Sequence, residues 1–88
     1  MLRRRQIVQD WIRVEDFEVG SSEYRSFEYH VVADEASARM TLTIKCLNAD
    51  CTAVRRLDPT ELPQGTDHGS YEAIATTRVK QLFANGKI

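Results

Sequence analysis

Apolar and polar residues alternate most regularly in the middle of the chain, between residues 24 and 47. Over two segments the apolar side chains recur at every second position: Phe27, Tyr29, Val31, Met40, Leu42, Ile44 and Cys46. A period of two that is rich in aromatic and β-branched residues predicts half-buried strands. The link Asp34-Glu35-Ala36-Ser37 is short and polar. We therefore expect the two strands to form an antiparallel hairpin.

The alternation also divides the hairpin into two faces, because successive side chains of a strand point to opposite sides of the sheet. We expect the core face to hold Phe27, Tyr29, Val31, Leu42 and Ile44. The opposite face is expected to hold Glu28, His30, Thr41, Thr43 and Lys45.

Two further segments are expected to add shorter strands. Residues 52–57 lie between the turn-forming residues 48–50 and Asp58-Pro59, and proline cannot donate to a sheet ladder. Residues 11–19 fit either a strand or an irregular helix, and we favour a strand because Ile12 and Val14 alternate with polar residues. Residues 58–69 contain both prolines and two glycines, which predicts a loop.

The period changes to that of a helix near the C-terminus. Ser70 is a suitable N-cap, and Glu72 follows in the first turn, where a negative charge is favourable. Asn85-Gly86 is a typical helix end, because glycine readily adopts the left-handed conformation. The intervening apolar side chains recur three and four residues apart, as on one helix face: Tyr71, Ile74, Ala75, Val79, Leu82 and Phe83.

These elements predict an α+β fold: a small antiparallel sheet of three to four strands packed against one C-terminal helix, in the order β-β-β-β-α. The apolar stripe of the helix and the core face of the sheet each need a partner, so a two-layer arrangement follows. A chain of 88 residues has room for a single domain, residues 1–88. Within it we expect residues 1–9 to be a mobile basic N-terminus.

Charge is balanced in total and uneven along the chain. The chain has 12 basic and 13 acidic residues, for a formal net charge of −1. The charge is +3 over residues 1–9, −6 over residues 10–35 and +2 over residues 36–88. Near-neutrality argues against a broad polyanion binder, whereas the uneven distribution leaves room for a polarised surface.

The N-terminal sequence and the hydropathy together predict a cytoplasmic protein with no membrane association. No apolar run approaches the roughly 18 residues that a membrane-spanning helix needs. Arginines at residues 3–5 resemble the start of a signal peptide, but polar residues replace the apolar stretch that should follow. Four acidic residues between positions 10 and 18 also argue against a mitochondrial presequence.

The cysteines and histidines offer a weak metal pattern. Cys46 and Cys51 are separated by four residues, and a zinc site would also need His30 and His68, the two histidines of the chain. Because Cys46 continues the apolar alternation of its strand, it is better explained as a core thiol. We expect no metal and no cofactor.

The segment Asp67-His68-Gly69-Ser70 contains the residue types of a catalytic triad within one loop. Adjacent residues of a loop rarely point at one another as a nucleophile, base and orienting acid must. Free backbone N–H groups at the helix start could instead hold an anion, although the glycine spacing of a phosphate loop is missing. We therefore expect no enzymatic activity and no catalytic residue.

The function that the sequence favours is that of a non-enzymatic interaction module. One helix cannot cover every apolar position of a four-stranded sheet, so an uncovered face or edge is expected to bind a protein partner or a second copy of the chain. The residues expected to take part are Trp11, Phe17, Val32 and Leu47.

An alternative is a nucleic-acid-binding accessory protein. Its basic patch would be formed by Arg55, Arg56, Arg78 and Lys80, and its affinity would fall steeply as salt rises. The sequence pI of about 6.1 is below the range typical of such domains. Nucleic acid is thus the less favoured partner.

Overall fold

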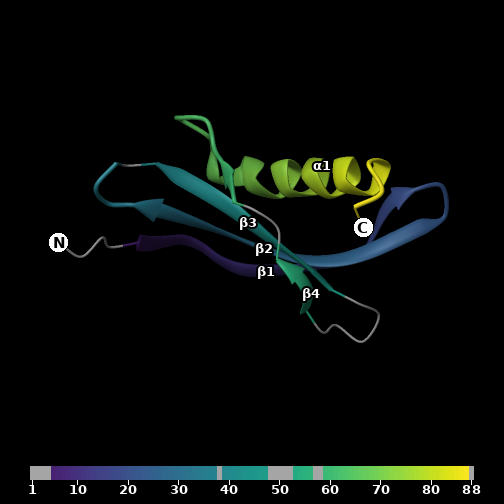
Figure 1. The fold of residues 1–88 in the computed structure, drawn as a ribbon. Coiled ribbons are helices and arrows are strands. Elements are labelled where there is room, and N and C mark those ends of the chain that lie inside the picture. Colours follow the sequence, from purple (N-terminus) through teal and green to yellow (C-terminus); the bar gives the residue numbers. More distant parts are fainter. Residues whose placement is uncertain (1–4, 38, 48–52, 57–58, 88) are drawn as a thin grey trace.

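The computed structural model describes residues 5–37, 39–47, 53–56 and 59–87. The described elements are strands β1 (Arg5–Gly20), β2 (Glu23–Asp34), β3 (Met40–Leu47), β4 (Ala53–Arg56) and β5 (Thr60–Glu61), a 3₁₀ turn (His68–Ser70) and helix α1 (Tyr71–Ala84). The antiparallel sheet has the order β1-β2-β3-β4, and β5 pairs with β3. Helix α1 lies across one side of this sheet (Figure 1). The predicted α+β fold and its β-β-β-β-α order are confirmed.

The central hairpin has the predicted pairing. β2 and β3 are antiparallel, and the register places Tyr29 opposite Ile44, His30 opposite Thr43 and Glu28 opposite Lys45. Residues that face each other across an antiparallel pair share one face of the sheet. The five side chains expected in the core are all buried, with exposures of 0% to 3%: Phe27, Tyr29, Val31, Leu42 and Ile44.

Strand β1 is longer and less regular than expected. It begins at Arg5 and not at Trp11. The expected mobile terminus therefore overlaps β1 from Arg5 onward, and residues 1–4 lie outside the described residues. The 16 residues of β1 pair with only 12 residues of β2, and the register shifts at four places. Each shift inserts one extra residue, so β1 contains four β-bulges.

The segment 58–69 is only partly the loop that the prolines and glycines predicted. Thr60 and Glu61 form β5 and pair with Leu42 and Thr41 of β3. The next residue, Leu62, is buried in the core, and its N–H donates to the carbonyl of Met40 at 2.9 Å. Of the expected third strand, residues 52–57, the structure describes residues 53–56, which form β4.

Helix α1 presents the predicted stripe to the sheet. Tyr71, Ala75, Val79 and Leu82 are buried, and Ile74 and Phe83 pack against the core while remaining partly exposed. Ser70 occupies the expected N-cap position but, among the described residues, does not cap the helix through its side chain. Ser70 precedes the helix, but it has a helical backbone conformation, and within residues 59–87 its side chain makes no capping hydrogen bond. The 3₁₀ turn at residues 68–70 already begins the helical path.

The helix ends at Asn85-Gly86, as the sequence predicts. Gly86 has a φ of +71°. Its N–H donates to the carbonyl of Phe83, and the N–H of Lys87 donates to the carbonyl of Leu82. These two bonds form a Schellman motif, which satisfies carbonyls that the last helical turn leaves without partners.

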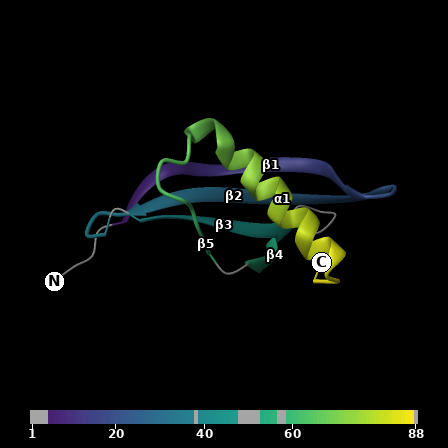
Figure 2. The same cartoon turned by 90° about the horizontal axis from the view of Figure 1, so that it is seen from above.

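Two layers result, and they leave one side of the sheet without a helix. Seen from above, α1 crosses the strands obliquely, and the ends of the long strands extend beyond it (Figure 2). The core lies between α1 and the sheet. Among the described residues, no element lies on the opposite side, which we call the open face.

Candidate functional site

The open face is defined by the residues that alternate with the core positions. On β2 and β3 these are Glu28, His30, Val32, Thr41, Thr43 and Lys45. On β1 they include Ile7, which pairs with Val32, and Arg13, which pairs with Glu28. The expected division of the hairpin into two faces is therefore confirmed. The face has two distinct regions, a centre and an end near the β2–β3 turn.

The centre of the open face is occupied by Trp11. The imidazole of His30 stacks on the indole, with ring centres 3.9 Å apart and an angle of 14° between the planes. The ammonium nitrogen of Lys45 lies 3.9 Å from the centre of the same indole. The indole of Trp11 is therefore shared by two contacts, one with His30 and one with Lys45. We call this arrangement the Trp11 sandwich.

A β-bulge places Trp11 in this position. The register of β1 shifts by one residue between Gln9 and Ile12, so the chain turns Trp11 to the open face while Ile12 remains on the core face. The carboxylate of Asp10 accepts the N–H of Trp11 at 2.8 Å, which gives this bulge amide a partner. The sequence pattern could not show this, because a bulge interrupts the alternation on which the pattern depends.

The Trp11 sandwich closes much of the centre to water. Thr43 points to the open face and is nevertheless only 7% exposed. Beside the sandwich, Arg13 reaches Glu28 at 3.5 Å and Glu15 at 4.0 Å. These pairs are partly exposed and contribute little to stability. The centre of the face is thus covered by the protein's own side chains.

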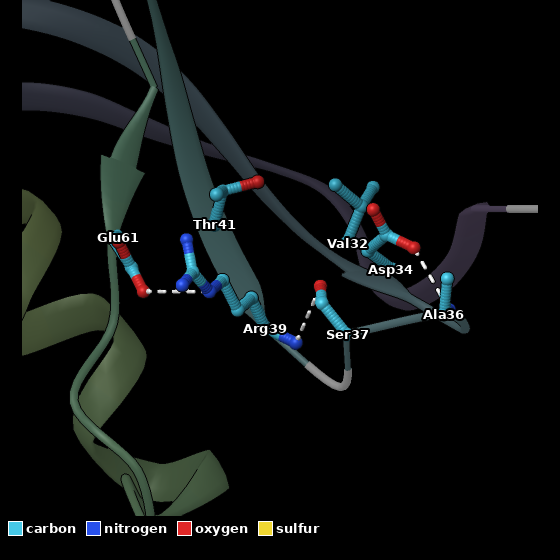
Figure 3. Close-up of a pocket in the computed structure, with 7 residues that line it drawn as sticks. All are labelled: Val32, Asp34, Ala36, Ser37, Arg39, Thr41 and Glu61. Carbon is cyan, nitrogen blue, oxygen red and sulfur yellow. Dashed lines mark hydrogen bonds and ion pairs between the residues drawn. The ribbon is translucent and has the colours of Figure 1, made fainter. Parts of the chain in front are cut away.

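The end near the β2–β3 turn is hollow. Figure 3 shows this hollow, which has a volume of about 380 Å³. Its walls are held by local contacts: Asp34 accepts the N–H of Ala36 at 2.9 Å, and Arg39 lies 3.7 Å from Glu61. The residues that line it are Val32, Asp34, Ala36, Ser37, Arg39, Thr41 and Glu61. We call this region, together with the neighbouring Ile7, the hairpin end.

Ile7 is the residue of this surface that the sequence analysis missed. It pairs with Val32, which lines the hollow, and it is 62% exposed. A large apolar side chain in this position stands beside a concave surface. Ile7 was missed because the strand was expected to start at residue 11. The pairing of Ile7 with Val32 depends on two bulges that lie between Ile7 and Ile12.

The four residues expected to bind a partner do not share one surface. Trp11 and Val32 lie on the open face. Phe17 lies on the other side, where it packs edge-on against Phe27 at 5.9 Å and lies under Lys80 of α1. A further bulge between Val14 and Phe17 turns this residue toward the core, so it does not lie on the open face, and its part in partner binding stays a prediction. Leu47 pairs with Ser26, and its side chain lies outside the described part of the structure.

The four residues of the expected basic patch are spread over different parts of the fold. The ammonium group of Lys80 lies 5.6 Å from the ring centre of Phe17, on the β1 side of α1. Arg78 lines a hollow with Thr60, on the β5 side of the same helix. In the backbone pairing, Arg55 lies opposite Cys46 and Arg56 opposite Lys45, and the side chains of both arginines lie outside the described part of the structure.

The remaining chemical candidates lie apart from one another. Cys46 is buried in the core, as expected, and Cys51 lies outside the described residues. His68 is exposed and its ring lies 5.0 Å from that of Tyr71, whereas His30 belongs to the Trp11 sandwich. Among the described residues, no three His, Cys, Asp or Glu side chains gather closely enough to hold a metal ion.

Comparisons with known proteins add no relative. No protein-family model, curated protein or solved structure matches the chain. Within the described ranges, no helix is long and apolar enough to cross a membrane.

Proposed function

We propose that this protein is a small non-enzymatic interaction module of the cytoplasm that binds a protein, either another chain or a second copy of itself, through the open face. The observation that carries this proposal is the exposed Ile7 beside the hollow that Val32 and Thr41 help to line. An exposed apolar side chain next to a concave surface favours contact with another protein.

The β1 edge of the sheet is a less suitable binding surface than the open face. β1 forms one edge of the sheet and is interrupted by four bulges. It also carries Asp10, Glu15, Asp16 and Glu18. Bulges and charges along an edge strand oppose the addition of another strand. The proposal therefore assigns binding to the face.

The nucleic-acid alternative has less support from the geometry and stays a prediction. The Trp11 ring already stacks on His30 and contacts Lys45, so a base that stacked there would compete with these side chains. Arg78 and Lys80 lie on different flanks of α1. A single strand of nucleic acid would have to cross the helix to contact both.

Site-specific crosslinking tests the proposal. A photo-reactive amino acid replaces Ile7 in one protein and Thr77, an exposed residue of α1, in a matched control. Each protein is irradiated in an extract of its source cells. We expect a protein adduct from position 7 that is absent from position 77. An adduct that nuclease removes would favour the nucleic-acid alternative. The same adducts from both positions, or none from position 7, would contradict binding through the open face.

A further inference from the structure

We propose that the hairpin end of the open face binds the same surface of a second copy of this chain, forming a two-fold symmetric dimer. This inference rests on the proposed function and specifies its partner. It uses Ile7, Val32, Asp34, Arg39, Thr41 and Glu61. The Trp11 sandwich is not its centre, because that region is already covered by His30 and Lys45.

A two-fold interface needs one surface that is complementary to itself. The hairpin end has the required shape, because a protruding apolar side chain, Ile7, adjoins a hollow of about 380 Å³ lined in part by Val32. A two-fold rotation brings the Ile7 side chain of each copy to the hollow of the other. Burial of Ile7 then removes from water an apolar side chain that is 62% exposed in the single chain.

The charges of this surface also favour a second copy over a polyanion. Arg39 lines the same hollow as two carboxylates, those of Asp34 and Glu61. The side chains of Arg39 and Glu61 are 71% and 61% exposed, so their 3.7 Å ion pair is weak in water and can exchange partners. In a dimer Arg39 of one copy can pair with an acid of the other. The phosphate backbone of a nucleic acid would instead be repelled by the carboxylates of Asp34 and Glu61.

The size of the face sets the expected affinity. The molecule measures 46 × 25 × 21 Å, and the sheet occupies the two longer dimensions (Figures 1 and 2). An interface over about half of that face buries roughly 600 Å² per partner, which is at the low end for specific complexes. We therefore expect a reversible dimer whose population depends on concentration, with a Kd in the micromolar range of about 10–500 µM.

Sedimentation equilibrium of the full chain tests the dimer. From about 5 µM to 1 mM we expect the mean mass to rise from 10.1 kDa toward twice that value. The variant Ile7→Asp is expected to weaken dimerisation at least about tenfold, because each added carboxylate would enter a hollow that already holds those of Asp34 and Glu61. Thr77→Asp adds the same charge to the exposed side of α1 and is expected to leave dimerisation unchanged.

A second measurement keeps the test independent of folding defects in a variant. In the unmodified chain, the amide NMR shifts of Ile7, Val32 and Thr41 are expected to depend on concentration, whereas that of Thr77 is not. Shifts confined to other surfaces, or a dimer that Ile7→Asp does not weaken, would overturn the proposed interface.

The outcomes also separate this inference from the proposed function. A chain that stays at 10.1 kDa throughout, and still forms an adduct with another protein at position 7, would overturn the dimer and leave the proposed function standing. A chain that stays monomeric and forms no adduct at position 7 would contradict both.

Discussion

Gly20 shows how one residue depends on a distant part of the chain. It ends β1, and a Cβ atom added there would lie 2.8 Å from Cε2 of Phe83 in α1. The guanidinium of Arg25 lies over the same Phe83 ring, 5.1 Å from its centre. The ring therefore has a second contact besides the one with Gly20. The sequence alone could not predict that Gly20 lies so close to another side chain, because Phe83 is brought there by the tertiary fold.

This contact predicts the effect of adding a single methyl group. Gly20→Ala is expected to lower the free energy of unfolding by about 1–2 kcal/mol, because the ring of Phe83 must move. Gly69→Ala is the matched control, since a Cβ there meets no described atom within 4 Å. It is expected to leave stability unchanged or to raise it by up to about 1 kcal/mol. Urea unfolding measures both variants, and equal effects would contradict the Phe83 explanation.

At the scale of elements, regular patterns were predicted well and interrupted ones were not. β2, β3 and α1 keep one period along their length, so their faces could be read from the sequence. In β1 each bulge shifts the alternation by one residue, which is why Trp11 and Phe17 lie on opposite faces although both are at odd-numbered positions. β5 has only two residues, and its pairing is provided by β3.

The contact between β2 and α1 contains a titratable group, Tyr29. Tyr29 as a whole residue is 3% exposed. Burial raises the pKa of Tyr29 above its ordinary value of 10.0, and the negative charge of Glu72 on α1 raises it further. The folded protein therefore favours the neutral phenol, while the unfolded chain ionises near pH 10. Stability from this group is fully present below about pH 10 and is lost as pH rises toward the folded-state pKa.

Replacement of Tyr29 isolates this effect. Urea unfolding is measured at about pH 8 and about pH 11, on either side of the ordinary tyrosine pKa. Tyr29→Phe is expected to lose less stability between these two values than the unmodified chain does, because no buried phenol remains to ionise. Tyr24→Phe is the control, because Tyr24 is 53% exposed, and this variant keeps the buried phenol of Tyr29. An unchanged alkaline loss in Tyr29→Phe would contradict the assignment.

At the scale of the whole molecule, the sequence predicted the existence of an uncovered face better than its contents. The number of strands and the single predicted helix implied that face. Its two regions depend on cross-strand contacts: Trp11 with His30 and Lys45, and Ile7 with Val32. Those contacts follow from the register of β1, which four bulges determine. The expected basic patch stays a prediction, because the side chains of Arg55 and Arg56 lie outside the described part of the structure.

The two sides of the sheet are expected to unfold together. Trp11, the single tryptophan of the chain, reports on the open face, and far-UV circular dichroism reports largely on α1. Both depend on the same strands, because His30 and Lys45 alternate with core residues that pack against the helix. We therefore expect the two signals to share one urea midpoint at concentrations low enough to keep the chain monomeric.

A core variant on the helix makes this test stringent. Val79 is fully buried in α1 and lies on the opposite side of the sheet from Trp11. Val79→Ala is expected to cost about 1–3 kcal/mol, and in a single cooperative unit it lowers the midpoints of both signals equally. If the dichroism midpoint fell while the Trp11 fluorescence midpoint stayed in place, the sheet would be stable without its helix. The open face would then be a property of the strands alone, and binding there would survive the loss of α1. Equal shifts would mean that every contact made on the open face also stabilises the helix on the other side.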